Sequence, residues 1–368
     1  MKKQIFAFQF LLVVLISTAF SQVDYSATAG KKTLLIMHPT VGTLSAITKL
    51  IDEGIFPVND IQLKGVYHFR ENNDYTESAK YIQEHNLSVI LEEVDEKLDA
   101  SILFRENPCS PVFEKLFNES SGVIFFGGPD IPPTVYGEKT SILTGIYDPY
   151  RHYFEASFLF HLLGGSQDES YIPLLEKKPE YMITGFCLGM QTINVATGGT
   201  MIQDIPSEIY KKYNVEDILN LPEENQHRNY ANDTEDSLSL FWGKIHPVKI
   251  MDNSWLVRDK LIIKGQNPAV VSSHHQALEK TGLNIRIVAT SMDGKIIEAI
   301  DHLKYPHVFG FQFHPEVPDI YNYNNSYQCK PTEHGSSLRV MIERGKGYEF
   351  HLSLWKKFAE ILNYSSDK

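Results

Sequence analysis

The sequence predicts an α/β protein with a doubly wound, mostly parallel sheet flanked by helices. Short apolar runs alternate with segments of helical spacing through about the first two hundred of its 368 residues, as in successive strand–helix–strand units. One apolar run ends in a glycine-rich loop, and another passes through a tight turn into a helix. Short β-rich segments from about residue 261 onward predict a small additional β element in the C-terminal half.

The N-terminal elements follow from apolar runs and their boundaries. Strands are expected over 31–40, 61–69, 88–94 and the first part of 120–133, with a helix over 76–86. The segment "PYRHYFEASFLFHLLGG" (149–165) is expected to form a buried helix, since Pro lies near its start and Gly at its end. Arg151 and Glu155 then share one face of it. The segment 180–200 predicts a strand, a tight turn, a helix and a glycine stop.

The C-terminal half contains shorter elements. Five β segments are expected, namely 261–265, 269–276, 285–291, 295–300 and 308–316, with a hairpin turn at "MDG" (292–294). An amphipathic helix is expected over 349–362. Two polar stretches near 207–240 and 319–348 are expected to be inserted loops or short elements.

The N-terminus has the layout of a secretory signal. Lys2 and Lys3 precede an apolar run that is too short for a transmembrane helix, and a cleavage site lies near Ser21/Gln22. We therefore expect a signal peptide over 1–21, a single domain over 22–368, and a secreted or periplasmic protein without a stable membrane anchor. An uncleaved anchor is the alternative. The formal net charge of −12 argues against nucleic acid as a partner.

Three cysteines occur, at 109, 187 and 329. In an exported protein an odd count indicates at least one free thiol. A disulfide between Cys109 and Cys329 and three unpaired thiols are both compatible with the sequence, because geometry decides pairing.

The segment "GFCLG" (185–189) places a cysteine on the expected strand-to-helix turn. Flanking glycines allow an unusual backbone there, and the helix that follows favours a thiolate at its N-terminus. The N–H of Leu188 would then point toward an oxyanion formed on an acyl group attacked by Cys187. The alternative is a cysteine that fills a gap in a buried turn.

Two further segments carry residue types that a thiol nucleophile requires. In "FQFHPE" (311–316), His314 can receive a proton and Glu316 can orient its ring, because the two side chains share a face of an extended segment. In "GGPDIPPTVYGE" (127–138), the N–H of Gly128 can supply a second oxyanion donor. An exposed strand end and an ordinary turn are the respective alternatives.

The pattern G-x-C-x-G-x-Q followed by H-P-E resembles class I glutamine amidotransferases. Its finer detail is similar to their hydrolase branch, the gamma-glutamyl hydrolases of peptidase family C26, typified by gamma-glutamyl-gamma-aminobutyrate hydrolases. Further similar segments are "GGPDIPPTVYGE" (127–138), "DPYRHYFEASFL" (148–159), 189–205, 270–278 and "DGKIIEAI" (293–300). The resemblance implies a flavodoxin-like sheet. It departs at Leu188, Val271 and His152, where this branch often has Arg, Asn and Asp.

The resemblance also implies residue roles. Cys187 would be the nucleophile, His314 the general base and acid, and Glu316 the orienting carboxylate. Gly128 and Leu188 would supply the oxyanion hole, and the substrate side would include Gln191, His275 and Gln276. The implied reaction is hydrolysis of a gamma-glutamyl amide of a small molecule, without metal or organic cofactor. The alternatives are a glutaminase that supplies ammonia to a partner and a non-catalytic binding protein.

Two expectations concern metals and assembly. The histidines show no ligand spacing typical of zinc, so no metal site is expected. The oligomeric state is left open between a monomer and a homodimer.

Overall fold

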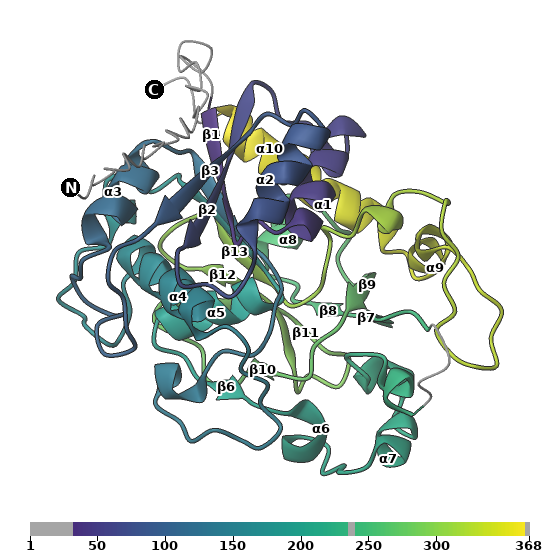
Figure 1. Cartoon of the computed structure of the whole chain (residues 1–368). Helices are drawn as coiled ribbons and strands as arrows, with labels where there is room; N and C mark the ends of the chain where they lie inside the picture. The colour runs from purple at the N-terminus through teal and green to yellow at the C-terminus, as the bar shows by residue number, and fades with distance from the viewer. Residues whose placement is uncertain (1–31, 235–239, 365–368) are drawn as a thin grey trace, which may run out of the picture. The chain divides into compact units, whose positions relative to one another are not determined.

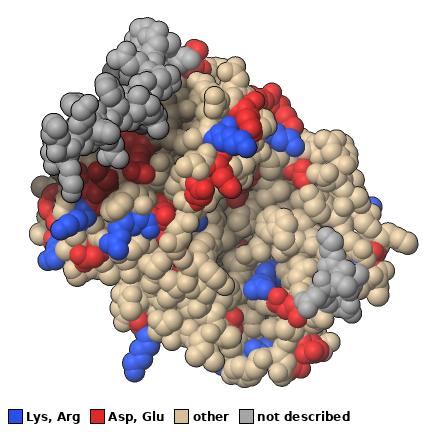
Figure 2. Space-filling model, in the orientation of Figure 1, with Lys and Arg blue, Asp and Glu red and all other residues tan. Residues whose placement is uncertain are grey.

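A computed structural model describes residues 32–234 and 240–364 (Figure 1). The expected signal peptide and its cleavage site lie outside the described residues. From Lys32 onward the chain forms one compact unit. Among the described residues, no helix has the length and apolar character needed to cross a bilayer. Acidic and basic side chains are interspersed on the face shown in Figure 2.

A nine-stranded sheet with the order β3-β2-β1-β4-β5-β13-β12-β11-β8 forms the centre of this unit. The strands from β3 through β13 in that order are parallel, and β12, β11 and β8 continue the sheet antiparallel. Their bounds are β1 Lys32–Met37, β2 Ile61–His68, β3 Val89–Val94, β4 Gly122–Phe125, β5 Met182–Phe186, β8 Lys249–Ile250, β11 Ile285–Thr290, β12 Ile297–His302 and β13 Val308–Phe311. The expected mostly parallel α/β fold is therefore confirmed.

Helices cover both faces of the sheet, because successive side chains of its buried strands point to opposite sides. In β1, Leu34 and Ile36 belong to one apolar core, and Leu35 and Met37 belong to the other. Each such side chain stabilises the fold by about 1.5–3 kcal/mol relative to an exposed position. The first core contains buried residues of α1 Val41–Asp52 and α10 Tyr348–Tyr364, beside which α2 Tyr75–Glu84 lies. The second contains residues of α3 Ser110–Asn118, α4 Pro149–Leu163 and α5 Leu188–Ala196.

One expected strand is absent. The segment 261–265 forms a turn after α8 (Trp255–Arg258), in which the N–H groups of Leu261 and Ile262 both donate to the carbonyl of Leu256. Leu261 and Ile262, which begin the apolar run, are buried beneath the turn. A short apolar run in the sequence does not distinguish a buried strand from a turn with buried side chains. The expected hairpin at 292–294 is confirmed, since it joins the paired strands β11 and β12.

Smaller elements surround the carboxyl end of the sheet. Two two-stranded sheets pair β6 Met201–Ile202 with β10 Ala277–Leu278, and β7 Lys244–Pro247 with β9 Ala269–Ser272. The two polar stretches contain short helices joined by turns, among them α7 Val215–Leu219 and α9 Leu338–Arg344. The first polar stretch supplies Arg228 and Tyr230 to the cavity described next.

Candidate functional site

Cys187 lies in a strained turn between β5 and α5. Its φ is 51° and its ψ is −107°, in a region that side chains other than glycine rarely occupy. The Cys187 N–H donates to the Phe311 carbonyl of β13 at 2.7 Å, which ties the turn to the neighbouring strand. The residue is 6% exposed. Such strain is typical of a nucleophile presented between a strand and a helix.

The two glycines around Cys187 allow α5 to approach the sheet. A methyl group on Gly185 would lie 2.4 Å from the carbonyl carbon of Gly189. One on Gly189 would lie 2.5 Å from the carbonyl oxygen of Phe125 in β4. Both contacts are to backbone atoms, which cannot rotate away. The spacing of glycines in "GFCLG" therefore follows from close packing of the helix on two strands.

Replacing Gly189 with alanine should therefore destabilise the protein by about 1–3 kcal/mol or more through overpacking. The measurement is the midpoint of urea unfolding. Gly42→Ala is the matched control, because a methyl group there would meet only the Thr40 hydroxyl, at 3.8 Å. Its midpoint should stay the same or rise, since alanine favours the helix. Equal midpoints for the two variants would contradict this explanation of the motif.

His314 and Glu316 form a buried pair beside Cys187. Nδ1 of His314 lies 2.7 Å from Oε1 of Glu316. The carbonyl of Pro315 between them accepts hydrogen bonds from the Tyr321 hydroxyl (2.8 Å) and the Trp355 indole N–H (3.0 Å). Both donors are buried and hold the segment after β13 in one conformation.

The surroundings of His314 favour its charged form. Burial opposes that charge, but the Glu316 carboxylate, the Cys187 sulfur and hydrogen bonds to both raise the pKa of His314 well above its ordinary value. The imidazole of His314 thus contacts the Cys187 sulfur on one side and the Glu316 carboxylate on the other. This arrangement can move a proton from sulfur to the ring and keep it there.

The loop after β4 lies against this pair. A methyl group on Gly127 would be 2.8 Å from Cε1 of His314 and 3.6 Å from Cβ of Cys187. One on Gly128 would be 2.9 Å from Cδ2 of Leu188. Among residues 32–234 and 240–364, the N–H groups of Gly128 and Leu188 have no acceptor. Gly128 and Leu188 thus lie close together, and within the described residues neither N–H is used by the fold.

Arg151 of α4 holds the loop after β4 in place through hydrogen bonds. Its Nη2 donates to the carbonyls of Phe126 and Gly127, each at 3.0 Å, and its Nε donates to Glu155 at 3.1 Å. Arg151 and Glu155 are both buried within α4. The expected sharing of one helix face is confirmed. The contact of the guanidinium with the loop was not evident from the sequence, because it joins segments about 25 residues apart.

Three glutamines take part in a chain of hydrogen bonds that leads to the Cys187 sulfur. The side-chain amide of Gln312 donates to Sγ of Cys187 at 3.7 Å. Gln191 donates to the Gln312 side-chain oxygen at 3.3 Å and to the Gln276 carbonyl at 3.5 Å. All three are buried. The sequence analysis named Gln191 and Gln276 but missed Gln312, although it belongs to the same segment as His314.

His275 faces a cavity of about 350 Å³ next to the loop after β4. Its Nε2 lies 3.1 Å from both oxygens of Asp130, and its Nδ1 lies 3.2 Å from Asp204. Burial opposes its charge, but the two carboxylates raise the pKa of His275 to about 9. The cavity suits a small polar molecule. Its lining comprises Pro129, Asp130, Leu143, Gly145, Tyr147, Asp204, Arg228, Tyr230 and His275.

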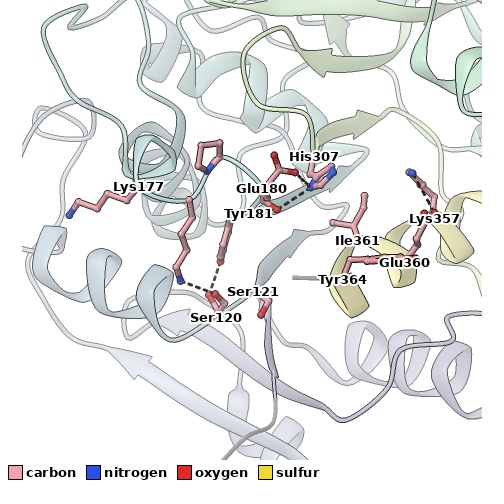
Figure 3. A pocket seen from close by; sticks show the side chains of 12 residues that line it. Ser120, Ser121, Lys177, Glu180, Tyr181, His307, Lys357, Glu360, Ile361 and Tyr364 are labelled. Atoms are coloured by element: carbon pink, nitrogen blue, oxygen red, sulfur yellow. Dashed lines mark hydrogen bonds and ion pairs between the residues drawn. The ribbon is translucent and has the colours of Figure 1, made fainter. Parts of the chain in front are cut away.

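A larger cavity of about 890 Å³ lies elsewhere (Figure 3). Ser120, Ser121 and Tyr181 line it, immediately before β4 and β5 begin. Ligands of open α/β sheets bind at the carboxyl ends of the strands, where Cys187 and Gly128 lie. The smaller cavity, which is lined by Pro129 and Asp130 of the loop after β4, is therefore the candidate ligand site; Cys187 and His314 are not among its lining residues.

Trp242 lies at the edge of the Cys187 site. Its ring centroid is 5.6 Å from that of His314, with the two planes nearly perpendicular. The indole is 46% exposed, so it shields the imidazole on one side while facing solvent on the other. The sequence analysis placed residues 207–240 in an insertion and gave Trp242 no role.

The three cysteines are free in the structure. Of the two alternatives left open by the sequence, three unpaired thiols is therefore the one observed. Burial, with a smaller effect of Glu96, raises the pKa of Cys109 to about 12. Burial also raises the pKa of Cys329. Cys187 differs from both because an imidazole contacts it.

Although the sequence shows no ligand spacing typical of zinc, four potential ligands come together in the fold. His227, His246, His274 and Glu298 converge, with one potential ligand atom of each within 4.8 Å of the others. These residues come from four separate segments, so their spacing in the sequence shows no metal-binding pattern. The tertiary structure alone brings them together.

Comparisons with known proteins agree with this geometry. A family model described as Peptidase C26 matches residues 63–316, a segment that contains Cys187 and ends at Glu316. The glutamine amidotransferase-like protein RP404 of Rickettsia prowazekii is 30% identical over 227 residues, covering 56% of this chain and 74% of that protein.

Two other relatives are more distant. The glutamine amidotransferase-like protein YvdE of Lactococcus lactis is 27% identical over 194 residues, covering 53% of this chain and 65% of that protein. Gamma-glutamyl-gamma-aminobutyrate hydrolase PuuD of Escherichia coli is 25% identical over 206 residues, covering 56% of this chain and 67% of that protein. The chain thus spans slightly less than two thirds of the Lactococcus relative.

Proposed function

The chain belongs to the peptidase C26 family, and on that premise we propose that it is an exported cysteine hydrolase of gamma-glutamyl amide bonds. The observation that supports this most is the contact of the Cys187 sulfur with His314, whose other ring nitrogen is held by Glu316. The name of the Escherichia coli relative supports the choice of a gamma-glutamyl substrate. The free N–H groups of Gly128 and Leu188 supply the remaining requirement, two hydrogen-bond donors to an oxyanion.

The proposed reaction proceeds in two halves. His314 first takes the thiol proton, the resulting thiolate attacks the gamma-carbonyl carbon, and the oxyanion is stabilised by the N–H groups of Gly128 and Leu188. The tetrahedral intermediate collapses as His314 gives its proton to the departing amine, which leaves a gamma-glutamyl thioester on Cys187. His314 then deprotonates a water that attacks the thioester carbonyl, and glutamate is released as sulfur regains its proton.

The cavity beside the loop is proposed to bind the glutamyl half. Arg228 contributes a guanidinium to its lining, oriented by Asp233 at 2.8 Å and stacked on Tyr230. A guanidinium matches a carboxylate in geometry and charge. Asp130 provides an acidic group at the same cavity, suited to the substrate ammonium.

Arg228→Gln should therefore raise KM by about 10- to 100-fold, the effect of losing one charged hydrogen bond, with a smaller change in kcat. Steady-state kinetics on a gamma-glutamyl dipeptide measures both. Arg286→Gln is the control, because Arg286 pairs with Asp301 on β12 and does not line the cavity. An unchanged KM for Arg228→Gln would remove this residue from the binding site.

The experiment that tests the function is a substrate panel. Gamma-glutamyl-GABA, glutathione, gamma-glutamyl dipeptides, polyglutamyl folate and glutamine are offered to the wild type, with glutamate release as the readout and Cys187→Ala as the background. Release above background supports hydrolysis. Ammonia from glutamine only when a partner is added would favour a glutaminase, and binding heat without turnover would favour a binding protein. An N-terminus at or near Gln22 in protein from the native host tests export.

A further inference from the structure

Four buried side chains from separate segments converge at a second place in the fold, and none of them is Cys187, His314 or Glu316. His227 lies in the loop before Tyr230, His246 in β7, His274 directly after β9, and Glu298 in β12. Each is at most 4% exposed. The ring centroids of His246 and His274 lie 4.9 Å and 5.0 Å from that of His227. This group is called the histidine cluster below.

In His246 and His274, the hydrogen bond made by one ring nitrogen shows which nitrogen carries the proton and which is free to bind a metal. Nδ1 of His246 lies 3.1 Å from the Pro247 carbonyl oxygen, and Nδ1 of His274 lies 2.7 Å from that of Gln276. A carbonyl only accepts, so each Nδ1 carries the proton and each Nε2 has a lone pair. Metal-bound histidines are held in the same way by a second hydrogen bond.

The atoms that face the histidine cluster have no hydrogen-bond partner among the described residues. They are Nε2 of His246, Nε2 of His274, both ring nitrogens of His227 and both carboxylate oxygens of Glu298. Nδ1 of His227 lies 3.0 Å from Oε1 of Glu298, but without the geometry of a hydrogen bond. Burying a carboxylate without partners is unfavourable, and a cation would satisfy all four side chains at once.

We propose that His227, His246, His274 and Glu298 bind one zinc ion. Three imidazole nitrogens and one carboxylate oxygen suit Zn²⁺ better than Mg²⁺ or Ca²⁺, which prefer oxygen ligands. Tetrahedral ligands about 2.1 Å from zinc lie about 3.4 Å apart. The separations of Glu298 from His227 (3.0 Å) and from His274 (3.9 Å) bracket that value. Four protein ligands leave no open position, so the ion is structural.

The ion would join the cavity wall to the sheet. His227 is followed directly by Arg228, which lines the cavity. The carbonyl of Glu298 accepts the N–H of Gln312, whose side chain contacts the Cys187 sulfur. Zinc would therefore connect a loop of the first polar stretch to the strand beside the sulfur. Binding of the metal does not depend on which reaction the enzyme performs.

A second group of potential ligands does not need an ion. His38, Glu71 and Asp148 also lie within 4.8 Å of one another. Their facing atoms are already partnered, since Nδ1 of His38 lies 2.6 Å from Glu71, and the two oxygens of Asp148 accept backbone N–H groups of Asn72 and Arg151. His38→Gln is therefore the matched control for the histidine cluster.

The test is the zinc content of the full chain, purified without a histidine tag, incubated with Zn²⁺ and desalted. Mass spectrometry of the metal should find about one zinc per chain in the wild type and in His38→Gln, and less than about a tenth of that in Glu298→Gln and His246→Ala. Co²⁺ in place of zinc should give the visible absorption of a tetrahedral nitrogen and oxygen site.

Less than about a tenth of an ion per wild-type chain would overturn the proposal, as would equal zinc in the wild type and both cluster variants. The wild type provides a second readout that needs no variant. Chelation should speed protease cleavage within 207–234, and Zn²⁺ should restore protection. Cleavage that is indifferent to chelation and re-addition would overturn the structural role.

Discussion

Cys187→Ala is expected to lower kcat/KM for the best gamma-glutamyl substrate by about 10⁴- to 10⁶-fold, because no other group at the site can form the thioester. The alanine methyl group occupies the position of the cysteine Cβ, so the fold and the cavity should persist. Steady-state kinetics measures the loss, and circular dichroism checks the fold. Intact-mass analysis of quenched wild-type reactions should find a glutamyl adduct that the variant lacks.

The matched control for that loss is Cys329→Ser. Cys329 is a half-buried free thiol whose sulfur lies 3.8 Å from that of Met341, and no imidazole is among its contacts in the described structure. Its kcat/KM should stay within a few-fold of the wild type. Loss of activity in Cys329→Ser but not in Cys187→Ala would place the reactive thiol elsewhere.

Glu316→Gln is expected to lower kcat by about 10²- to 10⁴-fold, because the ring of His314 then loses the group that orients it and stabilises its charge. It should also change the pH profile. Glu316 contributes to the raised pKa of His314, so removal of its charge lowers that pKa. The imidazolium then loses its proton at a lower pH. The alkaline limb of the kcat/KM profile should therefore move to lower pH.

Two observations keep this prediction specific. A merely structural role for Glu316 would lower activity equally at all pH values, without moving the alkaline limb. Glu360→Gln is the surface control, because Glu360 lies on α10 and its exposed carboxylate pairs with Lys357 at 3.4 Å. An unshifted limb in Glu316→Gln would remove Glu316 from the pair with His314.

The fold was predictable in large part because its signals are local. The continuous apolar run of β1 and the strand–turn–helix around Cys187 both come from residues close in sequence. The segment 261–265 was mistaken for a strand because burial of Leu261 and Ile262 gives the same apolar run in a turn. Helix α1 was not anticipated, although its N-cap Thr40 accepts a hydrogen bond from Thr43.

The site residues likewise fall into those recognisable from a local motif and those brought in by long-range contacts. The residue types at Cys187, His314 and Glu316 were recognisable because each follows from a short motif with its own chemical requirement. The contact of Arg151 with the loop after β4, the hydrogen bond from the Gln312 amide to the Cys187 sulfur and the cavity at His275 were not recognisable from the sequence. They join residues that are far apart in the chain.

By itself, the sequence determined the layered α/β architecture, the strained turn at residue 187 and the residue types expected around it, since periodicity and glycine placement act over a few neighbouring residues. The tertiary structure alone decided which long-range partners meet. It brought the imidazole of His314 to the sulfur and gathered the histidine cluster from four segments. Packing of strands and loops sets those distances, and no spacing along the chain encodes them.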